Sequence, residues 1–205
     1  MRRTKEQAAQ TREAILDAAL ACFNRRGLSK TTLDHIARAA RVTRGAVYWH
    51  FEGKEQIVHA LRERLSLPFL DRADTELLHG GGRPPLERIE HFLLGAFADV
   101  ERDVQKRQAL ELMHFRVEYV DALAGELDGI VANNKALARA FEVAYGEAES
   151  AGALMAGVSP RLAAYDTVIF VTGLVRLWLL DASAGGFRKS TPELIRAHLQ
   201  SRRRV

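Results

Sequence analysis

One short stretch of this chain, residues 42–51, combines a basic side chain with several aromatic ones. Arg44 carries a planar fork of donors that can grip O6 and N7 of a guanine. Tyr48 and His50 have polar tips that can hydrogen-bond phosphate oxygens, and Gly45 has no side chain to keep the backbone away from a phosphate. These residue types indicate contact with DNA, provided that they lie on one exposed surface.

The segments around these residues predict two short helices joined by a tight turn. An amphipathic segment from Thr31 to Ala40 is followed by a brief turn and then by Thr43, whose hydroxyl suits the N-cap of a second helix. Thr31, with Asp34 three residues later, resembles a capping box at the start of the first helix. In a helix-turn-helix the second helix enters the major groove of DNA. We expect Arg44, Gly45, Tyr48, Trp49 and His50 to face DNA, and Ala46, Val47 and Phe51 to face inward.

Spacing alone also allows a small helical domain with an aromatic core, but the residue identities favour DNA binding. From Thr32 to Lys54 the sequence reads TLDHIARAARVTRGAVYWHFEGK, which resembles the DNA-binding signature of TetR-family transcriptional repressors. It is most similar to the AcrR-like branch, whose members repress multidrug efflux pumps. The resemblance implies that Thr31 or Thr32 contacts phosphate and that Lys54 contacts the DNA backbone. The expected DNA-binding residues are therefore Thr31, Thr32, Thr43, Arg44, Gly45, Tyr48, Trp49, His50 and Lys54.

The distribution of charge agrees with this interpretation. Residues 1–64 hold 13 Lys and Arg against 7 Asp and Glu, whereas residues 65–205 hold 17 against 19, so the basic excess lies with the helix-turn-helix. Cys22 is the single cysteine, so neither a disulfide framework nor a cysteine metal site is expected. The N-terminus lacks the apolar segment of a secretory signal, and no apolar run approaches the roughly 20 residues of a membrane span. We therefore expect a cytoplasmic protein that does not enter a membrane.

The sequence carries no motif that indicates an enzyme. It lacks Gly-x-Ser-x-Gly, His-Glu-x-x-His and a nucleotide-binding fingerprint. No catalytic residue, cofactor or metal is expected.

The rest of the chain predicts an all-α protein of about nine helices. A first helix, from Glu6 to Arg26, ends at Gly27, and a long helix from Lys54 to His79 contains Pro68, which should kink or split it. The run from Gly80 to Pro85 is the clearest break. The later helices are expected at residues 86–103, 104–123, 126–151, 161–183 and 192–203. We assign residues 1–53 to a helix-turn-helix domain and residues 54–205 to a ligand-binding and dimerisation domain.

The predicted helix over residues 161–183 is apolar nearly all round, so it must be covered on more than one side. A second subunit could provide part of that cover, as the resemblance implies, because the last two helices form the dimer interface in that family. A pseudo-palindromic operator also requires a two-fold homodimer. The expected interface residues are Val168, Val171, Val175 and Leu179. A fully buried central helix of a monomer is the alternative.

Three polar residues of the second domain, Glu111, His114 and Glu118, share one face if residues 104–123 form a single helix. They could bind a metal, although helical metal sites need a second Glu-x-x-His pair. They could instead face solvent, or be polar points in an apolar pocket for a small lipophilic or cationic ligand. The expected pocket residues are Leu65, Phe69, Phe92, Phe97, His114, Glu118 and Trp178.

The predicted function is repression of transcription from a double-stranded DNA operator. Ligand binding would displace the long helix near Leu61 to Phe69 and release the operator, which the resemblance implies belongs to a multidrug efflux pump operon. A regulator of another pathway, answering to a metabolite or a protein partner, is the alternative that the sequence leaves open.

Overall fold

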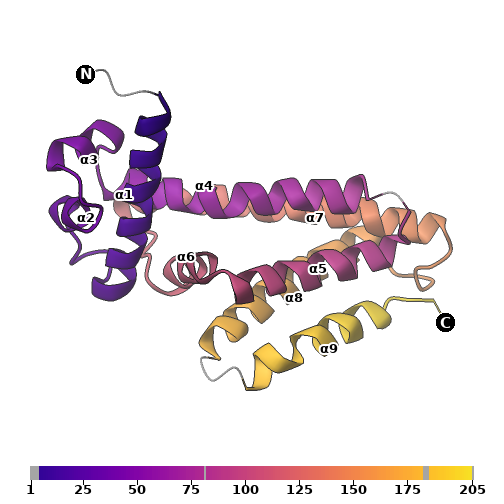
Figure 1. Ribbon diagram of the computed structural model, residues 1–205. Coiled ribbons are helices and arrows are strands. Elements are labelled where there is room, and N and C mark those ends of the chain that lie inside the picture. Colours follow the sequence, from indigo (N-terminus) through magenta and orange to yellow (C-terminus); the bar gives the residue numbers. More distant parts are fainter. Residues whose placement is uncertain (1–4, 81, 182–184, 205) are drawn as a thin grey trace. The chain divides into compact units, whose positions relative to one another are not determined.

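The computed structural model describes residues 5–80, 82–181 and 185–204, and within these ranges the protein has nine α-helices and no strands, which confirms the all-α prediction (Figure 1). Gly81 and Ser183, which belong to the predicted break and to a predicted helix end, lie outside the described residues. The helices are α1 (Lys5–Arg26), α2 (Leu33–Ala39), α3 (Arg44–His50), α4 (Lys54–Ala73), α5 (Pro85–Arg102), α6 (Val104–Phe115), α7 (Glu126–Ser150), α8 (Pro160–Leu180) and α9 (Gly186–Gln200). A π-helical segment, Asp74–Leu78, follows α4, and a 3₁₀ turn, Asp121–Leu123, precedes α7.

The chain forms two compact units, and they do not coincide with the division at residues 53 and 54. The head unit contains Met1–Leu65 and Asp103–Leu127, and the second unit contains Ser66–Arg102 and Asp128–Val205. The first half of α4 belongs to the head because Ile57, Val58 and Leu61 are fully or almost fully buried in its core.

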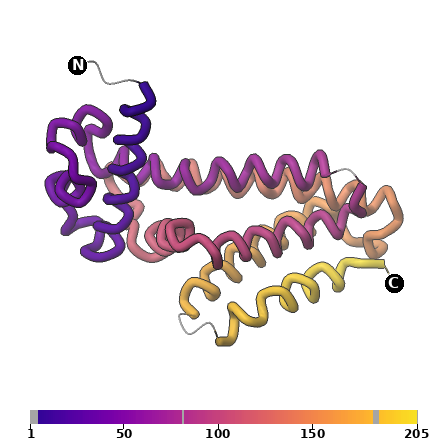
Figure 2. Tube along the Cα trace, viewed as in Figure 1, coloured from indigo at the N-terminus to yellow at the C-terminus, as the bar shows by residue number. Residues whose placement is uncertain are grey.

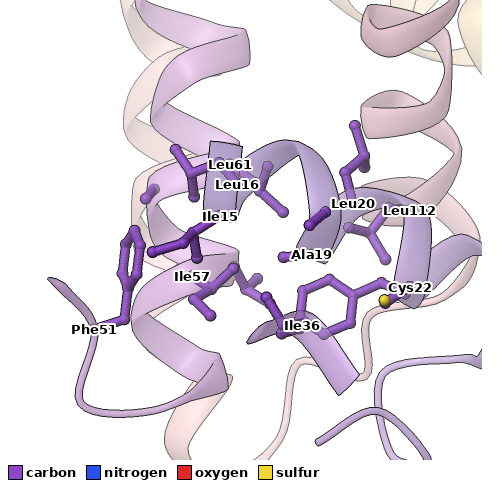
Figure 3. Packing of buried hydrophobic residues seen from close by; sticks show 14 of the residues in the cluster. Ile15, Leu16, Ala19, Leu20, Cys22, Ile36, Phe51, Ile57, Leu61 and Leu112 are labelled. Atoms are coloured by element: carbon purple, nitrogen blue, oxygen red, sulfur yellow. The ribbon is translucent and has the colours of Figure 1, made fainter. Parts of the chain in front are cut away.

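The core of the head is built on one face of α1 (Figure 3). Ile15, Leu16 and Ala19 from α1 are completely buried, and they pack with Ile36 of α2 and with the buried face of α4. Leu112 of α6 completes this core with no exposed surface. Asn24 adds a polar connection, since its Nδ2 donates to the carbonyl oxygen of Gln108 at 3.1 Å. Thus α6, which is distant in sequence, is a structural part of the head.

In the second unit, the segment after α4 is joined to α5 by an arginine. Arg72 Nε donates to Glu76 Oε1 at 2.6 Å, and its Nη1 donates to Asp99 Oδ2 at 2.8 Å. A Cβ at Gly95 would lie 1.9 Å from Arg72 Nη2, so only glycine allows the guanidinium to lie against the backbone of α5. Beside it, the rings of Phe69 and Phe92 are 5.2 Å apart.

Two helix predictions were wrong at one end, and of the two effects predicted for Pro68, a kink or a split, the structure excludes the split. The predicted helix over residues 104–123 ends at Phe115, so Glu118 is not helical and does not share a helical face with Glu111 and His114. Pro68 does not split α4, which continues to Ala73. The last helix begins at Gly186, and Pro192 lies inside it.

The outward face of α8 differs from the predicted one. Val171 is 9% exposed and Leu179 6%, so both point into their own unit, and Val168 and Val175 are half-buried. The strongly exposed apolar residues of α8 are Leu162, Ile169 and Leu180, and Tyr165 lies on the same stripe. Helix α9 runs beside α8, as the tube in Figure 2 shows, and adds the exposed Phe187 and Leu194. This outward apolar stripe replaces Val171 and Leu179 as the surface available to a partner.

Helix α8 is also long and apolar enough to cross a membrane, because its most apolar 18-residue stretch has a mean hydropathy of 1.5. Length and composition alone give weak evidence for a span, because the core helix of a soluble protein passes the same test. In this chain 44% of that 18-residue stretch of α8 is buried inside the molecule.

Candidate nucleic-acid interface

Helix α2 begins one residue later than the predicted capping box implies. Its N-cap is Thr32, whose hydroxyl accepts from the His35 backbone N–H at 3.2 Å, while the Thr32 N–H donates to His35 Nδ1 at 3.3 Å. Thr31 is completely buried, and its hydroxyl donates to the Gly27 carbonyl at 2.8 Å. Since Thr31 is used inside the head, the prediction of a phosphate contact is wrong for Thr31 and remains open for the exposed Thr32.

Helix α3 has the N-cap that the sequence predicts. The Thr43 hydroxyl accepts from the Ala46 backbone N–H at 3.1 Å. On the inward side Val47 is completely buried, and Phe51 just after the helix is 3% exposed. On the outward side Trp49 is 72% exposed and Tyr48 46% exposed. This confirms the inner position predicted for Val47 and Phe51 and the outer position predicted for Tyr48 and Trp49, whereas Ala46 and His50 are half-buried.

Two other residues of α3 were predicted to face DNA. Gly45 is exposed, and a Cβ added there would meet only the Thr43 hydroxyl, at 4.0 Å. Packing within the chain therefore does not require glycine at this position. His50 is half-buried, and its ring lies edge-on to Trp49 with the centroids 4.5 Å apart. His50 is thus less available to DNA than Tyr48 or Trp49.

Arg44 lies on the outer face in a defined position. Its Nη2 donates to the Tyr48 hydroxyl at 3.1 Å, and the guanidinium carbon is 5.3 Å from the centre of the Tyr48 ring. The hydrogen bond to Tyr48, helped by the negative charge of Asp34, raises the pKa of Arg44. Arg44 therefore remains a cation on the face that would approach DNA.

Lys54 stands at the start of α4, as predicted, but its ammonium group has partners within the chain. Nζ donates to the carbonyl oxygen of Leu28 at 2.9 Å and lies 3.5 Å from that of Ser29. These bonds fasten the turn between α1 and α2 to α4. An ammonium group has three donors, so one is left for a phosphate.

Sequence reasoning missed one charged group beside Arg44. Asp34 on α2 accepts from Arg38 Nη2 at 3.1 Å and lies 3.9 Å from Arg44 Nε. The spacing of Asp34 and Arg38, four residues apart in a helix, could have revealed the first pair. The approach of Asp34 to Arg44 depends on how α2 and α3 pack, and no local pattern encodes that.

The residues predicted to line a ligand pocket are divided between the two units. Phe69, Phe92, Phe97 and Trp178 lie in the second unit, where Phe92 also contacts Phe141 at 6.0 Å and Phe97 contacts Trp178 at 6.3 Å between ring centroids. Leu65 lies in the head and packs against its core. His114 is half-buried and Glu118 is exposed, both in the head unit.

The chain is similar to bacterial transcription regulators along nearly its whole length. Residues 15–61 match the family described as bacterial regulatory proteins, tetR family. The HTH-type transcriptional regulator TtgR of Pseudomonas putida is 32% identical over 185 residues, which cover 88% of this chain and 85% of TtgR. The repressor BepR of Brucella suis is 33% identical, covering 87% of this chain and 85% of BepR.

Solved structures agree with this relationship. NalD, the secondary repressor of the MexAB-OprM multidrug efflux pump in Pseudomonas aeruginosa, has a TM-score of 0.84 and 28% identity, and covers 98% of this chain and 99% of NalD. SmeT in complex with triclosan has a TM-score of 0.82 and 27% identity, and covers 95% of this chain and 92% of SmeT. Together with the capped recognition helix and its outward Arg44, Tyr48 and Trp49, this similarity shows that the chain belongs to the TetR family of transcriptional regulators.

Proposed function

We propose that this protein represses a multidrug efflux operon by binding a pseudo-palindromic operator, and that small lipophilic or cationic compounds release it. The observation that carries the proposal is the outer face of α3, where Arg44, Tyr48 and Trp49 are exposed while Val47 holds the helix to the head. A short helix held in this way can enter a major groove. Relatives named as repressors of efflux pumps support the choice of operon.

Within this proposal, Arg44 reads a base and the groups around it bind phosphate. An arginine that engages a guanine through two bonds discriminates against the other bases by about 1–3 kcal/mol. The hydroxyls of Thr32, Thr43 and Tyr48 would bind phosphate oxygens, and such contacts fix the register of the protein on DNA but carry no sequence information. The cytoplasm, where chromosomal DNA lies, is the corresponding location.

The proposal also requires a homodimer. A two-fold operator presents two equal half-sites about 34–36 Å apart, one helical turn, so two recognition helices must be linked in a two-fold arrangement. The outward apolar stripe of α8 and α9, defined by Leu162, Tyr165, Ile169, Leu180, Phe187 and Leu194, supports this association. Such a stripe in water favours burial against a second copy.

A lipophilic ligand would bind among aromatic residues of the second unit. Phe69, Phe92, Phe97 and Trp178 provide apolar and aromatic surface of the kind that lines drug-sized sites. The complex of SmeT with triclosan supports this class of ligand.

The test is selection of native genomic fragments by the purified full-length protein, followed by footprinting of the fragments retained. The expected result is a protected pseudo-palindrome upstream of an efflux transporter operon, and release of the fragment by triclosan or ethidium. A protected site before unrelated genes would contradict the efflux assignment. Retention of all fragments alike would contradict operator recognition itself.

A further inference from the structure

An acidic side chain lies beside Arg44, the residue proposed to read a base. Asp34 on α2 uses Oδ2 to accept from Arg38 Nη2 at 3.1 Å, and its Oδ1 lies 3.9 Å from Arg44 Nε. The side chains of Asp34, Arg44 and Arg38 are partly exposed, with exposed fractions between 44% and 76%. The carboxylate therefore connects the first helix of the helix-turn-helix to the residue expected to read a base on the second.

The contacts of Arg44 leave a particular edge of its guanidinium available. The Nε atom lies 3.9 Å from Asp34 Oδ1, and one Nη2–H is donated to the Tyr48 hydroxyl. Of the five N–H donors of an arginine, the remaining three lie on Nη1 and Nη2. That end of the fork can still bind O6 and N7 of a guanine with two parallel bonds.

A carboxylate at this position also has a cost for DNA binding. Sequence-independent affinity comes mainly from cations near phosphates, and Asp34 partly neutralises Arg38 and Arg44 and repels the DNA backbone. If it contributed only charge, it would weaken binding to every DNA sequence alike. Its second effect is to limit the orientations of Arg44, and a donor fork fixed in advance loses less conformational freedom when it binds.

We propose that Asp34 is a specificity-determining positioning residue that holds the Arg44 guanidinium for base recognition and lowers affinity for other DNA sequences. The inference rests on the proposed operator recognition and assigns part of its selectivity to an acidic residue. Removal of Asp34 should have two opposite effects: binding to unrelated DNA becomes tighter, and preference for the operator becomes weaker at the base that Arg44 reads.

The experiment uses full-length protein and a random 30-base-pair duplex library as the probe, so the operator sequence need not be known in advance. The wild type first selects its preferred duplex. Dissociation constants are then measured for this duplex and for a shuffled one, with the wild type, Asp34→Ala, Arg44→Ala and the double variant. Glu55→Gln is the matched control, because Glu55 is an exposed carboxylate of the head outside the Arg44 contacts, and thermal unfolding verifies that each variant is folded.

For Asp34→Ala, we expect binding to the shuffled duplex to tighten about two- to fivefold. We expect the ratio of shuffled to selected dissociation constants to fall about three- to tenfold, a part of the discrimination that one bidentate contact supplies. In the Arg44→Ala background the same change should leave the ratio unaltered, because the two residues act as a unit. Glu55→Gln should strengthen binding to both duplexes without changing their ratio.

A specificity ratio unchanged in Asp34→Ala, or lowered equally with and without Arg44, would overturn the inference. Neither outcome would affect operator recognition, since the wild type would still have selected a sequence. If the wild type selects no preferred sequence, the proposed function fails instead.

Discussion

Several side chains of the head have partners within the chain on the surface that DNA would approach. Arg44 is paired with Tyr48 and lies near Asp34, and Lys54 is bonded to the turn that follows α1. For Lys54 the resemblance implied only a contact with DNA. The structure adds a role in stability, because hydrogen bonds from a charged donor contribute more than those between neutral groups.

Lys54→Ala should therefore lower the stability of the protein as well as its affinity for DNA. The loss of its bonds to the Leu28 and Ser29 carbonyls should cost about 1 kcal/mol, which corresponds to a fall in Tm of about 2–4 °C for a chain of this size. Lys30→Ala removes a lysine charge from the turn to which Lys54 is bonded, and it is the control. An unchanged Tm, with a salt slope reduced by about one, would make Lys54 a phosphate contact alone.

At the scale of helices, the sequence predicted which segments are helical better than where they end. Gly27 has φ +82° and ends α1, and Gly152 has φ +68° after α7, as a glycine at a helix C-terminus should. The end of α6 has no such signal. There the Arg116 and Val117 N–H groups both bond to the Leu112 carbonyl, with no glycine or proline to mark the change.

The candidate-site residues, too, were predicted correctly only where a local pattern of the sequence determines their position. Thr43, Val47 and Phe51 were predicted correctly because capping and periodicity are local properties of the sequence. Val171 and Leu179 were predicted to face a second subunit but are buried in their own unit. The sequence of a helix that is apolar on all sides does not indicate which face its own unit covers. Asp34 was missed as a neighbour of Arg44 because their approach depends on packing between two helices.

Helix α8 leads to a prediction about assembly. Ile169 is 70% exposed on the outward apolar stripe, so Ile169→Glu should place like charges at a two-fold contact and give a monomer at micromolar concentration. Sedimentation velocity measures this directly. Val131→Glu, at a 47% exposed apolar position of α7, is the control and should remain dimeric. A dimeric Ile169→Glu would exclude this stripe as the interface.

Helix α9 leads to a prediction about pH. His198 Nε2 is 3.0 Å from the Thr167 hydroxyl and the ring stacks on Phe170, and burial lowers the pKa of His198 to about 4. The unfolded chain, with an ordinary histidine pKa near 6.5, binds this proton more readily than the folded one. The contribution of neutral His198 to stability is therefore complete above about pH 6.5 and decreases toward pH 4.

The measurement is thermal unfolding at several pH values between 4 and 8. The wild type should lose Tm more steeply below pH 6.5 than His198→Gln, which cannot take up a proton. Parallel curves for the two proteins would contradict a buried, neutral His198.

At the scale of the whole molecule, the face proposed to bind DNA and the aromatic residues proposed to bind a ligand lie in different units. Phe97 and Trp178 contact each other in the second unit, whereas Glu118 is an exposed residue of the head unit. In a regulator that couples two sites, a substitution that weakens only the contacts with the ligand alters release by that ligand and leaves the ligand-free affinity for DNA unchanged.

Trp178→Phe should therefore raise the triclosan concentration that releases the operator about fivefold, as expected for loss of about 1 kcal/mol of aromatic contact. Operator affinity without triclosan should stay the same. Glu118→Gln, at an exposed position, should change neither value, even with a cationic dye such as ethidium. Fluorescence anisotropy of a labelled operator measures all of these, and a weaker dye response in Glu118→Gln would show that this carboxylate does contact the ligand.

The two tryptophans also have a practical consequence. Trp49 is 72% exposed on the recognition helix, and Trp178 is 2% exposed in the second unit, so one chain carries two intrinsic fluorophores in opposite environments. Emission from Trp49 should be red-shifted and should respond to DNA, while emission from Trp178 should be blue-shifted and should respond to ligand. In unlabelled protein, Trp49→Phe retains only Trp178 and reports ligand binding, whereas Trp178→Phe retains only Trp49 and reports DNA binding. Stopped-flow measurements on the two variants then give the order in which ligand binds and DNA dissociates.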